Sequence, residues 1–344
     1  MKKPLHIAIL DVDVPVPNVY ASRGLYSSQF QRLLDDTASR LSNNSKRTKI
    51  HTTAFDIVGG QFPPLSSLNR KPRSQDHFFN DNSQEGEGDE AEEDETNPLA
   101  TPISGILITG SAASAYDTNK KWVSPLEEFI VTVFERYPHV RMFGSCFGHQ
   151  VIAKALLSRS CLSAGEGCGG EDPAAEGLRV ECCPAGKEVG LATMKLSPGF
   201  VDAFPCLQGR TEMRLQMVHG DWVAGRADAV PSPWINIGST GDCPLQGFYY
   251  PGRVLTYQGH FEFDSFVNRE TCLEFARREG WDEGDVARYV VAIGEVDGDG
   301  DDSKLAAEVV VRFFGGEAGI QEVAKSQEGK VGWVRRLVGS IMIW

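Results

Sequence analysis

The stretch VRMFGSCFGHQ, residues 140–150, places one cysteine between two glycines directly after an apolar run. The apolar residues 140–143 predict a buried strand, and residues 148–157 predict a helix that follows it at once. A strand that turns abruptly into a helix holds its turn residue in a strained conformation with an exposed tip, and flanking glycines let the backbones pass closely. We therefore predict an elbow with Cys146 at its tip.

The predicted elbow gives Cys146 two possible roles. At the start of a helix, unpaired N–H groups and the helix dipole favour a thiolate. The N–H of Phe147 could then bind the oxyanion that forms when the thiolate attacks a carbonyl. The alternative is a buried structural cysteine, because free cysteines are among the most buried residues. The glycine pattern also occurs by chance and does not decide between them.

A nucleophilic cysteine needs a base and a group that orients the base. His260 and Glu262, in the stretch YQGHFE, follow residues 254–258, which predict a strand. The pair would then lie at the carboxyl end of that strand, on the side where the elbow opens. Alternate residues of an extended chain face the same way, so Glu262 could reach one imidazole nitrogen while the other faces Cys146. A surface loop is the alternative interpretation of this pair.

The rest of the chain alternates predicted strands with predicted helices. Residues 5–10, 49–58 and 105–110 predict strands, and residues 30–41 and 126–134 carry apolar positions at helical spacing. This alternation predicts an α/β fold with a mostly parallel central sheet flanked by helices on both faces. Shorter runs between 178 and 263 predict further strands, some antiparallel, and the tail beyond Phe266 predicts helices, with Ser303 as an N-cap.

Length and charge limit the classes of protein to consider. The 344 residues, 41% of them hydrophobic, suffice for one large or two modest domains. Ten acidic residues and no Lys or Arg fall between 74 and 97, so they leave only −3 of the net charge of −13 to the rest of the chain. The charge distribution therefore gives no indication of a basic face for nucleic-acid binding. Residues 63–102 predict a disordered acidic insert, with an acidic interaction segment as the alternative.

Targeting and metal signals are weak. No apolar run approaches the 18 residues or so of a membrane span, and the N-terminal apolar stretch is too short for a signal peptide, so we expect a cytoplasmic protein without a membrane partner. The eight cysteines show no paired C-x-x-C spacing for zinc, which favours reduced thiols and no metal. Residues 297–302 with Glu308 have the spacing of a calcium loop, but Asp302 stands where the turn needs glycine, which favours a solvated loop.

Four ordered motifs resemble those of the class I glutamine amidotransferases. They are the elbow around Cys146 with Gln150, the His260–Glu262 pair, the stretch ILITGS at 106–111 and the stretch MVHGD at 217–221. The resemblance covers residues 5–275 without the insert. It implies a flavodoxin-like class I glutamine amidotransferase fold over residues 1–280 and leaves residues 281–344 as a C-terminal helical extension.

The resemblance also implies roles for individual residues and no cofactor. Cys146, His260 and Glu262 would form a catalytic triad, and Phe147, Gly110 and Ser111 would supply the oxyanion hole. Gln150 would help to hold the γ-glutamyl group. His219 would either contact the substrate or be a hydrogen-bonded structural histidine, and His149 would pack behind the elbow.

Two departures from the family pattern bear on the reaction. Phe261 replaces the usual proline between the histidine and the glutamate, and Gly110-Ser111-Ala112 replaces Gly-Gly-Pro, which is closer to the stand-alone γ-glutamyl peptidase branch. We therefore expect a cysteine-dependent hydrolase or transferase that acts on the γ-glutamyl amide bond of glutamine or small γ-glutamyl compounds through a thioester. The alternatives are a glutamine amidotransferase that delivers ammonia to a synthetase or biosynthetic partner, a biosynthetic acyl-transfer enzyme, and a non-catalytic binding protein that retains the fold.

Overall fold

Parallel strands form the centre of the molecule. The computed structural model describes residues 5–41, 49–69, 99, 101–158, 177–294 and 300–317. In these residues the main sheet has seven strands in the order β2-β1-β3-β4-β12-β11-β9. Their bounds are β1 Leu5–Asp11, β2 Ile50–Asp56, β3 Gly105–Ile108, β4 Arg141–Ser145, β9 Ile235–Asn236, β11 Phe248–Tyr250 and β12 Val254–Tyr257. The pairs from β2 to β12 are parallel, whereas β11 and β9 form an antiparallel edge.

Alternating apolar residues cover the two faces of this sheet with different helices. On β1, Ile7 and Ile9 face one core together with α2 (Tyr26–Leu41) and α9 (Ser303–Gly315). Ala8 and Leu10 face the other core, where α3 (Val123–Arg136) and α4 (Phe147–Ala153) pack. Because successive side chains of a strand point to opposite faces, fully apolar strands are buried on both sides. The predicted α/β class with helices on both faces is confirmed.

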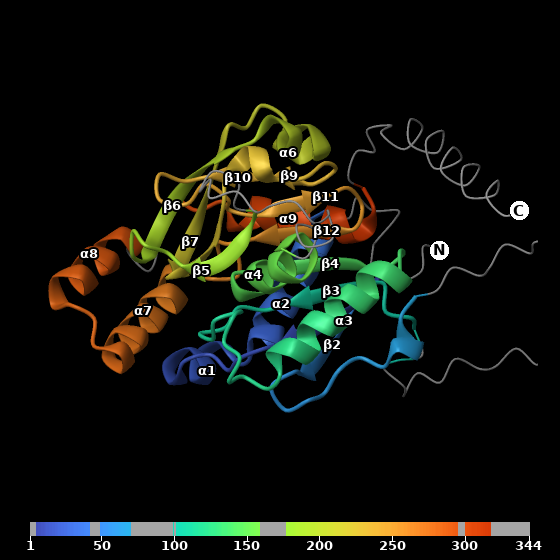
Figure 1. Cartoon of the computed structure of the whole chain (residues 1–344), viewed down its shortest axis with the longest axis horizontal. Coiled ribbons are helices and arrows are strands. Elements are labelled where there is room, and N and C mark those ends of the chain that lie inside the picture. The colour runs from blue at the N-terminus through green and yellow to red at the C-terminus, as the bar shows by residue number, and fades with distance from the viewer. Residues whose placement is uncertain are drawn as a thin grey trace, which may run out of the picture.

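Two smaller sheets lie beside the main one (Figure 1). β6 (Glu188–Leu196) pairs with β7 (Glu212–His219) and with β10 (Gly238–Ser239). β5 (Arg179–Cys182) pairs with β8 (Asp221–Ala224). The remaining short elements are α1 (Pro17–Arg23), α6 (Pro198–Ala203), a π-helical turn at Lys154–Ser158, and single turns at Leu65–Ser67, Pro205–Leu207 and Ala227–Ala229.

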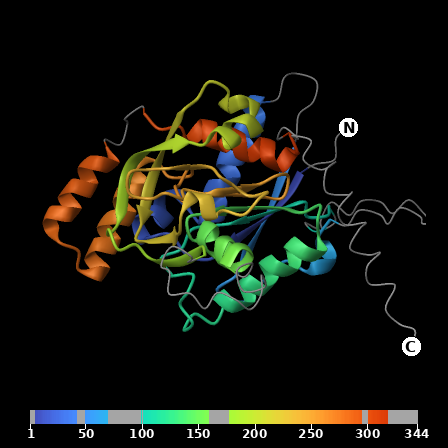
Figure 2. The same cartoon turned by 45° about the horizontal axis from the view of Figure 1, so that its top comes forward.

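Helices α7 (Ser265–Glu279) and α8 (Glu283–Ile293) lie side by side at one end of the molecule (Figure 2). In contrast, α9 buries Val309, Val310 and Phe313 in the core that α2 also lines, so part of the predicted extension completes the main body. Asp302, and not Ser303, occupies the N-cap position of α9. No helix of the described ranges is both long and apolar enough to cross a membrane.

The predicted insert is described only at its edges. Leu68 is buried and bridges Ile103, so this part of the predicted insert contacts the main body. Residues 70–98 and 100, which hold the acidic run, lie outside the described residues, as do residues 297–299 of the calcium-like stretch.

Candidate active site

The predicted elbow is present between β4 and α4. Cys146 has a φ of 50°. Among the described residues, it is the only one other than glycine with a positive φ. A Cβ on Gly144 would lie 2.4 Å from the carbonyl of Gly148, and one on Gly148 would lie 2.4 Å from the carbonyl oxygen of Ile108. Both glycines are therefore required by close backbone approach, and the turn residue between them is held in a strained conformation.

The Cys146 side chain lies at a pocket of about 270 Å³, slightly below the common size range for small-molecule sites, about 300 to 1,000 Å³. Its backbone N–H donates to Tyr257 O at 2.8 Å, and Gln258 Nε2 donates to its sulfur at 3.6 Å. As the first residue of α4, Phe147 has an N–H without a partner inside the helix. The thiol thus has one hydrogen-bond donor at its sulfur and lies at the N-terminus of α4.

His260 and Glu262 come to the same edge of the sheet as Cys146. β12 runs parallel to β4 with Tyr257 opposite Ser145, so the residues after both strands emerge together. A Cβ on Gly110 would lie 3.0 Å from His260 Cε1 and 3.6 Å from Cys146 Cβ, so the side chains of His260 and Cys146 both begin or end next to this glycine. His260 Nδ1 is 2.7 Å from Glu262 Oε1, and both side chains are buried.

The protonation of His260 reflects this burial and its neighbours. Burial alone would lower the pKa of His260, but the charges of Glu262 and Cys146 and hydrogen bonding to both raise that pKa to about 10. His260 Nε2 is buried without a well-formed hydrogen bond among the described residues. In unliganded sites, contacts between a base and its nucleophile are often long and tighten when substrate binds. The arrangement favours the protonated imidazolium form of His260.

Two side chains that sequence reasoning missed fix the His260–Glu262 pair. The Ser145 hydroxyl, wholly buried, donates to Glu262 at 3.1 Å to Oε1 and 3.3 Å to Oε2. The ring of Phe263 stacks on the imidazole of His260. Ser145 directly precedes the cysteine and Phe263 follows the glutamate, so only their position next to the motifs could have indicated them.

The predicted oxyanion loop, Gly110 and Ser111, follows β3 and is held by Asp13. One carboxylate oxygen of Asp13 accepts from Ser111 Oγ at 3.1 Å and from Ala112 N at 2.9 Å. The Ser111 hydroxyl is therefore engaged with Asp13, and its backbone is what the loop can present to the pocket. Asp13 follows β1, and no local pattern indicated this contact.

Gln150 and His219 both line the pocket, but the amide nitrogen of Gln150 and both ring nitrogens of His219 are hydrogen-bonded within the protein. Gln150 Nε2 donates to Asp221 O at 2.9 Å and to Gln258 Oε1 at 3.2 Å. His219 Nδ1 donates to Asp221 O at 3.0 Å, and Nε2 is 2.9 Å from Glu188 Oε2. Burial alone would raise the pKa of Glu188, but His219 and further hydrogen bonds lower it. Substrate contacts of His219 would thus come from its ring carbons.

His149 lies behind the elbow, wholly buried, with Nδ1 2.9 Å from Thr256 Oγ1. Burial and the charge of His219 lower the pKa of His149 to about 3, so the ring is neutral. In the part of the chain that the structure describes, no three His, Cys, Asp or Glu side chains cluster as ligands of a metal ion would.

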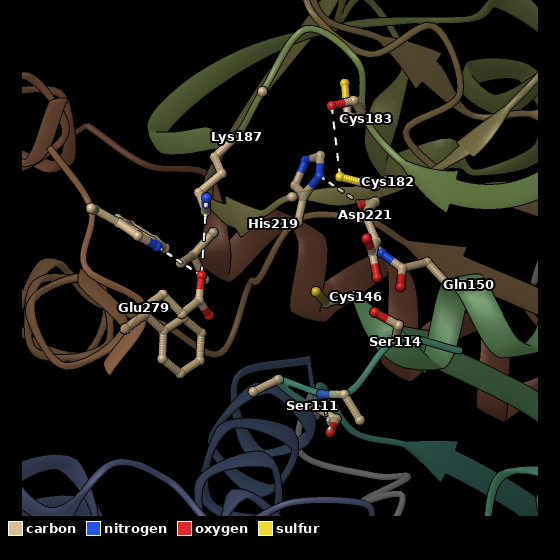
Figure 3. Close-up of a pocket in the computed structure, with 17 residues that line it drawn as sticks. Ser111, Ser114, Cys146, Gln150, Cys182, Cys183, Lys187, His219, Asp221 and Glu279 are labelled. Atoms are coloured by element: carbon tan, nitrogen blue, oxygen red, sulfur yellow. Dashed lines mark hydrogen bonds and ion pairs between the residues drawn. The ribbon is translucent and has the colours of Figure 1, made fainter. Parts of the chain in front are cut away.

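The opposite side of the pocket contains residues that no motif indicated. Figure 3 shows Lys187 and Glu279 on one side of Cys146, with Gln150 and Asp221 on the other. Trp281 and Phe275 also line this pocket. Lys187 comes from the loop before β6, Phe275 and Glu279 come from α7, and Trp281 comes from the loop after α7. The sequence of these segments carries no catalytic or binding motif.

Comparison with known proteins finds relatives in sequence and solved structures with the same fold. No family model matches the chain. A glutamine amidotransferase-like protein of Schizosaccharomyces pombe is 28% identical over 76% of this chain and 81% of its own length. A protein of Saccharomyces cerevisiae named as a glutamine amidotransferase is 36% identical over 49% of this chain and 57% of its own length.

Two solved glutamine amidotransferases share the fold. The protein from Thermotoga maritima has a TM-score of 0.51 at 13% identity and covers 90% of this chain and 98% of its own. The protein from Methylobacillus flagellatus has a TM-score of 0.50 at 16% identity, over 91% of this chain and 95% of its own. Together with the elbow and the parallel sheet described above, these comparisons show that the chain is similar in sequence to glutamine amidotransferases and has the class I glutamine amidotransferase fold.

Proposed function

We propose that this protein hydrolyses γ-glutamyl amide bonds through a γ-glutamyl thioester on Cys146. The observation that carries the proposal is the meeting of Cys146 and His260 against Gly110, with Glu262 bonded to the far nitrogen of the imidazole. A thiol, a base and an orienting carboxylate in that order are what covalent acyl transfer requires. Gly110-Ser111-Ala112, which resembles the peptidase branch, favours a stand-alone hydrolase over an amidotransferase that feeds a partner.

In this mechanism the thiolate of Cys146 attacks the γ-carbonyl carbon and forms a C–S bond. The carbonyl oxygen becomes an oxyanion that the N–H of Phe147 and the Gly110–Ser111 loop would stabilise. The tetrahedral intermediate then breaks its C–N bond as His260 gives its Nε2 proton to the leaving nitrogen. An amine or ammonia departs and the γ-glutamyl group remains on sulfur.

Hydrolysis of the thioester restores the site. His260, now neutral, removes a proton from a water molecule that attacks the thioester carbonyl. The C–S bond breaks, glutamate leaves, and the thiolate and imidazolium are regenerated. Throughout the reaction, Glu262 accepts a hydrogen bond from His260 Nδ1–H. This contact keeps the ring in place and stabilises its positive charge.

The proposal is tested by incubating the protein with glutamine and with a γ-glutamyl dipeptide and measuring intact mass after an acid quench. We expect a glutamyl adduct on Cys146 and release of the amine. Cys146→Ala should abolish both while the protein stays folded. Cys206→Ala is the matched control, since Cys206 is half-buried and does not line the pocket. Turnover by the Cys146→Ala variant would refute the mechanism.

A further inference from the structure

The wall of the pocket formed by Lys187, Phe275, Glu279 and Trp281 has no role in the mechanism above. It consists of charged and aromatic groups in one place. Lys187 Nζ lies 4.6 Å from the centre of the Trp281 ring and 4.0 Å from Glu279 Oε2. Trp281 Nε1 donates to Glu279 Oε2 at 2.7 Å, which fixes the indole. A cation over an indole face beside an apolar ring is suited to a small ligand that has both an anionic and an apolar part.

The ammonium of Lys187 retains capacity for such a ligand. Its side chain is 37% exposed, and within the described residues its ion pair with Glu279 is at the outer limit of contact. An ammonium carries three N–H donors, so one loose pair leaves donors for an incoming carboxylate. Glu279 is 52% exposed and would weaken the binding of an anion, since like charges repel.

The position of the wall indicates which half of a substrate it would contact. His260 has to protonate the leaving nitrogen, so the leaving group must lie on the imidazole side of Cys146. Phe263, which stacks on His260, belongs to the same apolar cluster as Phe275 and Trp281. Gln150, expected on the γ-glutamyl side, lies across Cys146 from Lys187 (Figure 3).

We propose that Lys187, Trp281 and Phe275 form a leaving-group subsite. The subsite takes γ-glutamyl amides whose amine half is an amino acid or short peptide with an apolar side chain and a free carboxylate. The carboxylate pairs with Lys187, and the apolar part packs on Trp281 and Phe275. Glutamine, whose leaving group is ammonia, cannot use these contacts. This inference rests on the proposed function, and it names the substrate class that the same site prefers.

The test compares three substrates that differ only in the leaving group: γ-glutamylphenylalanine, γ-glutamylphenethylamine, which lacks the carboxylate, and glutamine. We expect kcat/KM to be highest for γ-glutamylphenylalanine. Lys187→Gln should lower its preference over γ-glutamylphenethylamine by about fivefold, the upper end for a partly exposed ion pair. Glu279→Gln should raise the same preference. Lys195→Gln is the matched control because Lys195 is an exposed residue of β6 outside the pocket, and it should leave this preference unchanged.

Lys187→Gln and Glu279→Gln should change this preference in opposite directions, which separates substrate recognition from a structural effect. General damage to the wall would lower the preference in both variants. The subsite would be overturned if the wild type showed equal kcat/KM for the two phenyl substrates, or if Lys187→Gln showed no loss of the preference. A glutamyl adduct on Cys146 would still support the proposed function in either case. Absence of any adduct on Cys146 with all three substrates would refute the proposed function and the subsite with it.

Discussion

The ring of Phe263 lies parallel to the imidazole of His260, with centroids 4.0 Å apart and an interplanar angle of 10°. Phe263 is itself held by Tyr26, whose ring stacks on it at 6.1 Å. The imidazole therefore has a carboxylate at its edge and an aromatic face above it. A protonated ring is attracted to such a face by the negative charge density of the π-system.

Replacing Phe263 by leucine should weaken catalysis without removing any polar group. A desolvated cation–π contact is worth about 1 to 2 kcal/mol, so we expect kcat to fall by roughly 5- to 30-fold. Steady-state kinetics with a γ-glutamyl dipeptide measures this. Phe266→Leu is the control because Phe266, at the start of α7, has its ring under the guanidinium of Arg23 from α1. Equal losses in both variants would show that the stack has no specific effect.

The stability of the folded protein should depend on pH through His260. Its pKa is raised on folding from the ordinary 6.5 to about 10, so its charge contributes stability fully below pH 6.5 and loses it as the pH rises toward 10. Glu262→Gln removes the largest favourable cause of this rise. We expect the variant to be less stable by about 3 kcal/mol at pH 6 and the gap to shrink by pH 10.

Urea unfolding of both proteins from pH 6 to pH 10 measures that gap, and other titrating groups cancel in the difference. Glu128→Gln serves as a control because Glu128 is exposed on α3, and its gap should stay near zero at every pH. A gap for Glu262→Gln that stays constant or widens as the pH rises would contradict the assigned charge of His260.

Motif-bearing parts of the site were predictable because they depend on local backbone rules. A cysteine between two glycines at a strand–helix junction requires an elbow, and the structure shows Gly144 and Gly148 in close backbone contact. The alternation of His260 and Glu262 likewise indicated two side chains able to meet. The apolar strands also indicated the parallel sheet, because a continuous apolar run in the sequence indicates a strand that is buried on both faces.

Contacts between distant segments could not be predicted in this way. Asp13 meets Ala112 across 99 positions, and Glu188 meets His219 only because β6 and β7 pair in register. Nothing in the local sequence around Lys187 or Trp281 indicates that they share a pocket. The helices at the end of the chain illustrate the same limit, because α9 packs into the main core although it lies outside the family motifs.

Ser145 should act as a positioning residue for Glu262. Its buried hydroxyl donates to the carboxylate, and hydrogen bonds to charged groups contribute about 1.5 to 3 kcal/mol. We expect Ser145→Ala to lower kcat about tenfold with little change in KM. The pH profile of kcat/KM should shift as well, because the carboxylate that orients His260 loses a donor. Ser145→Thr keeps the hydroxyl and should restore both, and a threonine variant as impaired as alanine would disprove the role.

Gly148 should be the position where the smallest substitution does the most damage to the fold. A methyl group there would lie 2.4 Å from the carbonyl oxygen of Ile108, and backbone cannot rotate away as a side chain can. Gly148→Ala should therefore lower the free energy of unfolding by about 3 kcal/mol or more, the upper end of overpacking costs.

Gly241→Ala separates this clash from the general effect of adding a methyl group. An added Cβ at Gly241 would have no neighbour within 4 Å, and its change in unfolding free energy should stay within about 0.5 kcal/mol. Urea unfolding of both variants gives the comparison. Because the clash would push α4 away from β3, Gly148→Ala should also slow alkylation of Cys146 by iodoacetamide in the folded state. Full stability and unchanged alkylation would mean that the elbow tolerates a wider separation of α4 and β3 than the structure shows.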